Sequence, residues 1–400
     1  MRTQINMPKT ILPFRETDQS EWIKQLHKEL QNQTDLLVYK DPIEGLEIDL
    51  TKEVEQIGIP SKNNPEWKNI FHLEVSDEKI ANKLLLAALM QGATGLLLSS
   101  NKNSCNWAEV LANIEVAYID CWIVLKNQTE LSQFEQEDLL AKKSHILFLF
   151  KEGVECNYFS AFDLHQIGAT ISTQLGFLLL SLHRSLESTE LKSNYFFEFG
   201  VSTQYFLELA KLRAFRHLIS RLEAIHDVKI SFELIVKTGF SNKSLKDPYT
   251  NLLRQATEAL SAVAGGCDAL CIQPYDQLSS AGSDDFSRRM ALNIGNLIQE
   301  EVQMKSNTDP LKDARTVEAL TTAIVHQAWE TLLAADEFEN LTDFKPAIEQ
   351  ARESRLQKFK TGEQFLIGVN QFENTFDTKV KSWGTIPAAF GFPYLIYELA

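Results

Sequence analysis

The sequence predicts an α/β fold, a (β/α)8 TIM barrel preceded by an N-terminal arm made of a helix and a hairpin. Between about residue 70 and residue 375, short stretches that are apolar on both faces alternate with amphipathic stretches. This alternation is typical of a parallel sheet covered by helices. Roughly seven such units fit a closed eight-stranded barrel better than an open sheet. No phosphate loop or G-x-G-x-x-G opens an expected helix, so a nucleotide-binding open sheet is not indicated.

The expected strands are short and almost wholly apolar. They lie at Phe71–Val75, Gly95–Ser99, Tyr118–Leu125, Ile146–Phe150, Ile230–Val236, Asp268–Gln273 and Phe365–Val369. The expected helices run over residues 77–90, 107–116, 202–222, 247–264, 284–301 and 317–335. Ser76 or Asp77 can cap the first helix, and Asp247-Pro248 places proline at the first helical position of the fourth.

The two ends of the chain differ from the barrel pattern. Trp22–Leu30 reads as a short amphipathic helix, and Leu36–Lys40 with Gly45–Leu50 reads as a hairpin. We therefore expect three parts. Residues 1–70 form an arm for subunit contact, residues 71–375 form the barrel, and residues 376–400 form an extension that packs on the barrel or leads onward.

Charge and composition exclude several classes of protein. The chain has 39 Lys+Arg against 54 Asp+Glu, a net charge of −15, which argues against a nucleic-acid binder and against a polybasic membrane-surface protein. No run of about 18 apolar residues predicts a membrane span, and no signal peptide is recognised at the start. Five scattered cysteines fit reduced thiols, and Cys267 and Cys271 read as buried small hydrophobes. A cytoplasmic protein is expected.

Three segments carry a family resemblance. Phe206–Arg216 (FLELAKLRAFR) is followed by Asp247–Arg254 (DPYTNLLR) with Ala264–Ala269 (AGGCDA), and then by Arg288–Asn293 leading to Asp309-Pro310. In sequence, order and spacing they resemble the substrate-binding barrel of methylmalonyl-CoA mutases. Phe365–Asn370 resembles the closing strand of that barrel. The resemblance implies a family that interconverts methylmalonyl-CoA and succinyl-CoA with adenosylcobalamin, where the cofactor supplies the radical chemistry and the protein supplies a sealed cavity.

The resemblance also locates departures from the active pattern. Phe162 and Asp163 occupy the positions of the family's Tyr-His pair. A phenylalanine donates no hydrogen bond, and an ionised aspartate only accepts and would repel an anionic substrate. Residues 49–68 lack the family's aromatic and Arg-containing segment, and Asp309–Ala314 lacks two of its glycines. We therefore expect no catalytic residue on this chain, and Phe162 and Asp163 are degenerate positions.

Three other groups of residues are weighed against structural roles. His165 lies in an Asp-x-His-x-x-Gly match to the family's cobalt-ligating signature, but we prefer a histidine near a helix start that a backbone carbonyl satisfies. Glu300 and Glu301 are either a cofactor-facing pair or a solvated pair. A further set of basic residues is expected to make structural ion pairs rather than to bind CoA phosphates: Lys211, Arg213 and Arg216. No metal site is expected.

The sequence is therefore interpreted as the small, non-catalytic subunit of a heterodimeric methylmalonyl-CoA mutase. Its expected partner is the large catalytic subunit, which would bind most of the adenosylcobalamin. Two alternatives stay open. The chain could be an active acyl-CoA mutase barrel that uses a separate cobalamin-binding chain, or a regulatory module that binds CoA esters. Small hydroxyl residues along the barrel axis would favour the module, and bulky fillers would oppose it.

Overall fold

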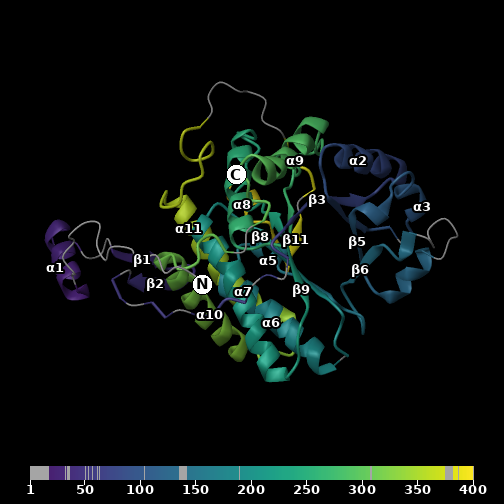
Figure 1. The fold of residues 1–400 in the computed structure, drawn as a ribbon. Helices are drawn as coiled ribbons and strands as arrows, with labels where there is room; N and C mark the ends of the chain where they lie inside the picture. The colour runs from purple at the N-terminus through teal and green to yellow at the C-terminus, as the bar shows by residue number, and fades with distance from the viewer. Residues whose placement is uncertain are drawn as a thin grey trace, which may run out of the picture.

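The computed structural model is a nearly closed parallel barrel (Figure 1). It describes residues 18–31, 33, 37–49, 51–52, 54–55, 57–60, 62, 64–102, 104–134, 142–188, 190–306, 309–373, 382–385 and 387–399. The barrel strands are β3 (Lys68–Val75), β4 (Gly95–Ser100), β5 (Asp120–Leu125), β6 (Ile146–Phe150), β7 (Tyr158–Ser160), β8 (Tyr195–Val201), β9 (Phe232–Thr238) and β10 (Ala269–Cys271). Their order is β6-β5-β4-β3-β10-β9-β8-β7, with every pair parallel, so the predicted (β/α)8 class is confirmed.

The barrel has a seam between β6 and β7, where the described residues form no strand ladder. Asn157 forms hydrogen bonds across the seam. Its Oδ1 accepts from the Phe150 N–H at 2.8 Å, and its own N–H donates to the Phe150 carbonyl at 3.1 Å. Residues 151–157 are all described and contain no helix, so the fourth unit of the barrel lacks one. The hydrogen bonds between Asn157 and Phe150 thus take the place of a ladder between β6 and β7, where the helix of the fourth unit is missing.

The other units carry helices. These are α2 (Glu78–Met90), α3 (Trp107–Val110), α5 (Phe162–Gln166), α6 (Ile171–Ser188), α7 (Tyr205–His226), α8 (Thr250–Ala264) and α9 (Asp285–Glu300), followed by α10 (Arg315–Ala334) and α11 (Lys345–Lys360). Asp77 caps α2, because its side chain accepts from the Ile80 N–H at 2.8 Å. The helix expected from residue 247 begins at Thr250, whose hydroxyl donates to Asp247 at 2.5 Å.

The expected closing strand at Phe365–Val369 is wrong. That stretch forms turns, with only an isolated bridge between Ile367 and Gln371, and Gly368 bends the chain at φ +78°. The ring is already closed by β10, in which Ala269 and Leu270 pair with Lys68 and Asn69 of β3. Strands β7 and β8 were not predicted, because β7 has only three residues and β8 is interrupted by a charged residue.

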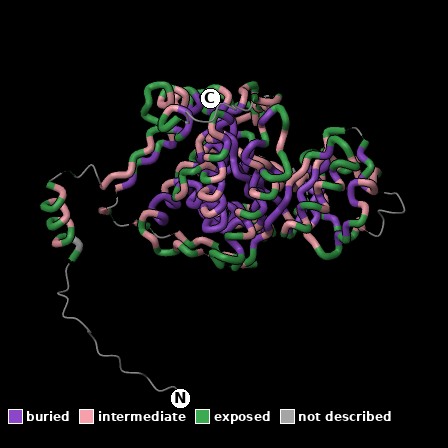
Figure 2. Tube along the Cα trace, turned by 90° about the horizontal axis from the view of Figure 1, so that it is seen from above, coloured by how far each residue is buried: buried purple, intermediate pink, exposed green. Residues whose placement is uncertain are grey.

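Buried residues are concentrated inside the barrel and between its strands and helices (Figure 2), and the apolar ones form two large outer cores, one inner core and a small cluster of Leu209, Ala264 and Val317. The first half of the barrel, β3 to β6, packs its outer face against α2 and α3 around Leu85 and Trp107. The second half, β7 to β10, packs against longer helices around Phe197 and Phe215. Within the described residues, no helix is long and apolar enough to cross a membrane. Cys267 and Cys271 are 1% and 2% exposed, so their expected burial is confirmed.

The N-terminal arm has the expected helix and hairpin. The helix α1 (Gln19–Glu29) lies apart from the barrel (Figures 1 and 2), and β1 (Val38–Asp41) pairs antiparallel with β2 (Leu46–Asp49). The hairpin is anchored by Glu44, which is buried. Its Oε2 accepts from the Ile171 N–H at the start of α6 at 2.7 Å, and its other oxygen pairs with Arg355. A carboxylate is favourable at a helix N-terminus, so Glu44 fixes the base of the arm to the barrel.

The described part of the C-terminal extension lies over the barrel. It contains β11 (Ala388–Ala389), β12 (Phe392–Pro393) and α12 (Ile396–Leu399). The Leu395 N–H donates to the Gln166 carbonyl at 2.8 Å, and Tyr394 and Leu395 are buried. The extension therefore brings an aromatic side chain to the end of α5.

Candidate functional site

The carboxyl ends of the strands place a layer of polar side chains inside the barrel. Alternate residues of a strand point inward, and this layer is formed by His72, Ser99, Lys151, Ser160, Glu198 and Lys237. Five of these residues lie on strands, and Lys151 directly follows β6. Active sites of barrel enzymes lie at this end of the strands, so this layer is the candidate site.

Below the polar layer the barrel axis is filled by apolar side chains. The inner core comprises Ile70, Leu97, Trp122, Val124, Leu149, Tyr158, Phe196, Ile235, Ala269 and Cys271. The rings of Trp122 and Phe196 are 6.0 Å apart, and both residues are almost completely buried. At the opposite end, Lys68 lies 3.1 Å from both Asp120 and Glu233 and 4.8 Å above the Trp122 ring. These contacts close the axis against a long ligand.

A cavity of about 830 Å³ lies beside the polar layer. It extends from Ser99 and Glu198 inside the barrel to Phe177, Ser181 and Arg184 on α6, outside the barrel wall. The cavity therefore passes through the region of the seam. Its volume lies within the range of about 300–1,000 Å³ that is usual for small-molecule sites.

A buried ion pair forms the base of the cavity. Lys237 pairs with Glu198, and the Ser160 hydroxyl donates to the Glu198 carboxylate at 2.6 Å. Burial acts to raise the pKa of Glu198, but the Lys237 ammonium and the Ser160 hydroxyl outweigh it and lower the pKa to about 2. Burial and the Lys237 charge lower the pKa of His72 to about 3, and its Nε2 lies 3.5 Å from the Lys237 Nζ. His72 is neutral at pH 7.

The structure places Phe162 and Asp163 on the wall of this cavity. Phe162 is buried against Phe240, with ring centroids 6.0 Å apart, and lies 5.4 Å below the Lys237 Nζ. Asp163 is exposed and accepts a hydrogen bond from the Tyr394 hydroxyl of the C-terminal extension. The Tyr394 hydroxyl, from the C-terminal extension, therefore lies beside Asp163 and donates its hydrogen bond to the Asp163 carboxylate.

His165 does not line this cavity and lies against the backbone of Gly200 in β8 and of Gly239 just after β9. A Cβ at Gly200 would lie 2.7 Å from its ring, and one at Gly239 would lie 3.0 Å from its Nε2. Its Nδ1 is 4.0 Å from Glu208, not on a backbone carbonyl as expected, and burial lowers its pKa to about 3. With only 8% of its surface exposed, His165 does not fit the role of a ligand to a cobalt ion held by another chain.

Glu300 and Glu301 lie at the opposite end of the barrel from Phe162 and Asp163. Both are exposed at the end of α9, next to Gln299, which donates to the Trp67 carbonyl just before β3 begins. Helices of a barrel run back along the strands, so the end of α9 lies beside the start of β3. The structure does not bring these two carboxylates to the cavity.

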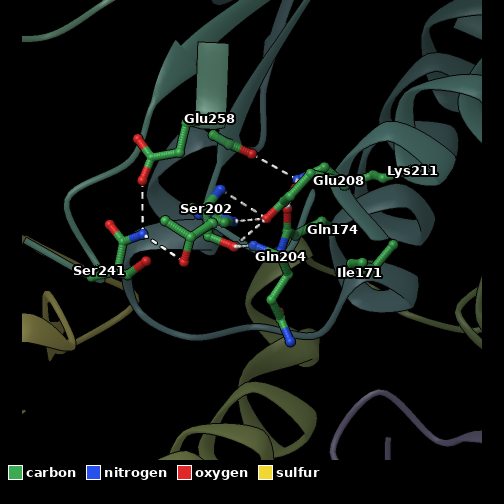
Figure 3. A network of polar contacts seen from close by, with 12 residues as sticks. Ile171, Gln174, Ser202, Gln204, Glu208, Lys211, Ser241 and Glu258 are labelled. Atoms are coloured by element: carbon green, nitrogen blue, oxygen red, sulfur yellow. Dashed lines mark hydrogen bonds and ion pairs between the residues drawn. The ribbon is translucent and has the colours of Figure 1, made fainter. Parts of the chain in front are cut away.

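The basic residues of α7 make structural ion pairs. Lys211 is fully buried and pairs with Glu208 while donating to the Gly200 carbonyl at 2.6 Å (Figure 3). Arg213 lies 2.7 Å from Glu318, and Arg216 lies 2.7 Å from Asp268. Because the Lys211 hydrogen bond joins α7 to β8, and the two arginine ion pairs join it to α10 and to the residue before β10, the structural interpretation is favoured over phosphate binding.

The polar layer was not predicted from the sequence. Glu198 is the only charged residue in β8 (YFFEFGV), and Lys237 is embedded in the apolar run of β9. A single charge inside an apolar strand is a signal of a paired or functional group, because an unpaired buried charge is very costly. This signal could have identified Glu198 and Lys237 from the sequence. The position of Lys151 could not be predicted in this way, because it depends on the missing helix.

Comparisons with known proteins point to one family. A family model described as methylmalonyl-CoA mutase matches residues 157–386. The methylmalonyl-CoA mutase small subunit of Porphyromonas gingivalis is 30% identical over 234 residues, covering 54% of this chain and 38% of that protein. The methylmalonyl-CoA mutase of Rhizobium meliloti is 29% identical over 231 residues, covering 53% and 32%. The small subunit of Propionibacterium freudenreichii is 26% identical over 189 residues, covering 46% and 29%. The aligned parts span roughly a third of these relatives.

Proposed function

Since this chain belongs to the methylmalonyl-CoA mutase family, we propose that it is the small, non-catalytic subunit of a heterodimeric mutase. Two of the relatives described above bear the name small subunit, which supports a partner chain. In this proposal the partner is the large catalytic subunit, and the complex isomerises methylmalonyl-CoA and succinyl-CoA in the cytoplasm. This chain contributes a folded barrel and a binding surface.

The observation that carries the proposal is the closed barrel axis. Trp122, Phe196 and Leu149 occupy the space inside the strands, and the ion pairs of Lys68 cover its lower end. Bulky fillers count against a CoA ester that runs along the axis, and so against the regulatory module that binds such esters. Phe162 and Asp163 count against the active mutase barrel, because the phenylalanine ring has no hydrogen-bond donor and the Asp163 carboxyl accepts from the Tyr394 hydroxyl.

The arm supports association with a partner. The α1 helix is capped by Asp18, which accepts from the Glu21 N–H at 2.8 Å, and it carries Trp22 with 45% of its surface exposed. It lies apart from the barrel, so its apolar face is available to another chain (Figures 1 and 2). Aromatic residues of this kind dominate many interfaces.

Adenosylcobalamin enters the proposal through the partner chain. The enclosed position of His165 does not fit cobalt ligation, and Glu300 and Glu301 lie at the far end of the barrel. No catalytic step is therefore assigned to residues of this chain through the cofactor.

The proposal is tested by mixing this chain with the separately purified large subunit and measuring mass by light scattering. We expect a stable 1:1 complex. Trp22→Glu should weaken it by roughly tenfold or more, because an exposed aromatic anchor is replaced by a charge. A matched Tyr118→Glu change, at a residue that is 87% exposed on the barrel, should leave association unchanged. Failure of the wild-type chain to bind would contradict the proposal.

A further inference from the structure

We propose that the cavity of about 830 Å³ described above binds a carboxylic acid with an apolar chain. The acid enters through the side of the barrel where the fourth helix is missing. This inference goes beyond the proposed subunit role and does not depend on the partner. The site is formed by residues of this chain alone.

The shape of the cavity follows from the missing helix. Phe177, Ser181, Arg184 and Ser185 are spaced i, i+4, i+7 and i+8, so they share one face of α6. In a complete barrel this face would be next to the helix between β6 and β7, which residues 151–157 do not form. The face instead lines the cavity. The cavity therefore reaches through the barrel wall to α6, whereas the lower part of the barrel axis is filled by the inner core.

The partners of the carboxylates that line the cavity indicate which kind of ligand it binds. Each lining carboxylate already has a partner: Glu74 with Asn101, Glu152 with Lys126 at 3.9 Å, Asp163 with Tyr394, and Glu198 with Lys237 and Ser160. At least one oxygen of each of these carboxylates therefore already accepts a hydrogen bond or an ion pair. A ligand that brings acceptors fits better than one that brings donors.

Lys151 provides the positive charge for that ligand. It lines the cavity, and among the described residues no carboxylate lies within 4.0 Å of its ammonium group. It follows Leu149 by two positions, which continues the inward alternation of β6. The Lys237 Nζ lies 3.5 Å from the His72 Nε2, and Lys151 lines the same cavity as these two residues. A carboxylate between the two ammonium groups would make charge-assisted hydrogen bonds.

The rest of the cavity is suited to an apolar chain. Phe159, Phe162, Phe177, Leu341 and Tyr394 line the path from the polar layer to the α6 face. Phe177 is held by edge contacts with Phe344 and Phe390, at centroid distances of 5.8 and 6.0 Å. These neighbours keep the ring in place, so the apolar wall is preformed.

Calorimetric titration of the full chain tests the proposal with three probes of equal chain length. We expect sodium octanoate to bind with a 1:1 saturable isotherm, and octylammonium and octan-1-ol to bind at least about tenfold more weakly, since one charge-assisted hydrogen bond is worth about that factor. If octanoate gives no saturable binding, or if the alcohol or the amine binds as tightly, the proposal is overturned.

Two variants locate the site. Lys151→Met should weaken octanoate binding by about tenfold or more. The matched Lys360→Met, at an exposed lysine on α11, should leave it unchanged. Ser181→Trp should abolish binding by filling the cavity at the α6 face, and melting curves of each variant check that the fold is intact. Equal affinities for the two lysine variants, or undiminished binding to a folded Ser181→Trp protein, would contradict the assignment.

Discussion

The first four strands of the barrel, β3 to β6, are covered by α2 and α3, which have 13 and 4 residues, whereas α6 to α9 in the second half have 15 to 22 residues. The family match begins at Asn157, the residue that bridges the seam between the two halves. The family resemblance is therefore concentrated in the second half, and the missing helix marks its boundary.

The comparison shows what the recognisable motifs do. Glu208, Lys211, Arg213 and Arg216 belong to the FLELAKLRAFR segment, and each makes a buried contact that joins α7 to a neighbour. In the second segment, Asn251 donates to the Ser244 and Tyr275 carbonyls at 2.8 and 3.1 Å. These motifs identify the family, yet in this chain they hold the barrel together. The presence of these motifs in this chain is thus explained by their packing contacts, and it does not imply catalysis.

The largest effect is expected from breaking the buried network of the second half. Lys211→Met leaves Glu208 buried without its partner and should lower the free energy of unfolding by about 3–5 kcal/mol in urea titrations. The exposed pair Lys229–Glu223 provides the control, because Lys229→Met should cost less than about 1 kcal/mol. If the two variants lost similar amounts of unfolding free energy, the buried ion pair of the motif would be no more important for stability than the pair at the surface.

A core substitution in the first half should act locally. Leu85→Ala removes a fully buried side chain from the core of β3 to β6 and should cost about 2–5 kcal/mol. The halves are joined by the two-residue register of β3 with β10, by Asn157, by the Lys68–Glu233 ion pair and by hydrogen bonds from Asn69 to α9. Because β4 to β6 lie next to the altered core, hydrogen exchange should accelerate more in β4 to β6 than in β8 and β9. Equal acceleration in both halves would show a single cooperative unit.

Acid should destabilise both halves, since each holds one neutral buried histidine. His72 and His165 have pKa values lowered to about 3, mainly by burial, and their unfolded values are near 6.5. Below pH 6.5 the unfolded state binds more protons, so stability falls as the pH decreases toward 3. Each histidine should cost about 2 kcal/mol between pH 6.5 and pH 5.

Urea titrations at pH 7, 6 and 5 measure this loss. His165→Gln should reduce the pH dependence by about half. The exposed His145→Gln should not change it. A pH-independent stability in this range would show that neither imidazole is kept neutral by the fold.

The smallest effect is expected at the seam. Asn157→Ala removes the acceptor of the Phe150 N–H and should cost about 1–3 kcal/mol, because a partly buried donor is left without a partner. Exchange of the Phe150 amide should accelerate, while that of Phe196, whose N–H donates to the Asn157 carbonyl, should not. Unchanged exchange at Phe150 would show that the seam is held by other contacts.

Local sequence patterns predicted many of the helices and strands of this fold, but they could not predict features that depend on contacts between distant segments. Asp77 was recognisable as a cap from its place before an apolar periodic run. Phe365–Val369 is apolar enough for a strand, but the barrel had already closed through β10, which no local pattern shows. Phe162 and Asp163 line the cavity, whereas Glu300 and Glu301 lie at the opposite end, and the degenerate role of Phe162 and Asp163 stays a prediction. Lys151 and Asn157 gain their roles only from the absence of the fourth helix.

The most direct measurement of the central claim is methylmalonyl-CoA turnover by the reconstituted complex, with Asp163→Asn in this chain. The substitution removes the charge at the degenerate position and keeps the size of the side chain. The account predicts the same turnover as the wild-type complex, because the barrel of this chain takes no part in the chemistry. A fall of about a hundredfold or more, the size expected for a lost acid–base group, would contradict it.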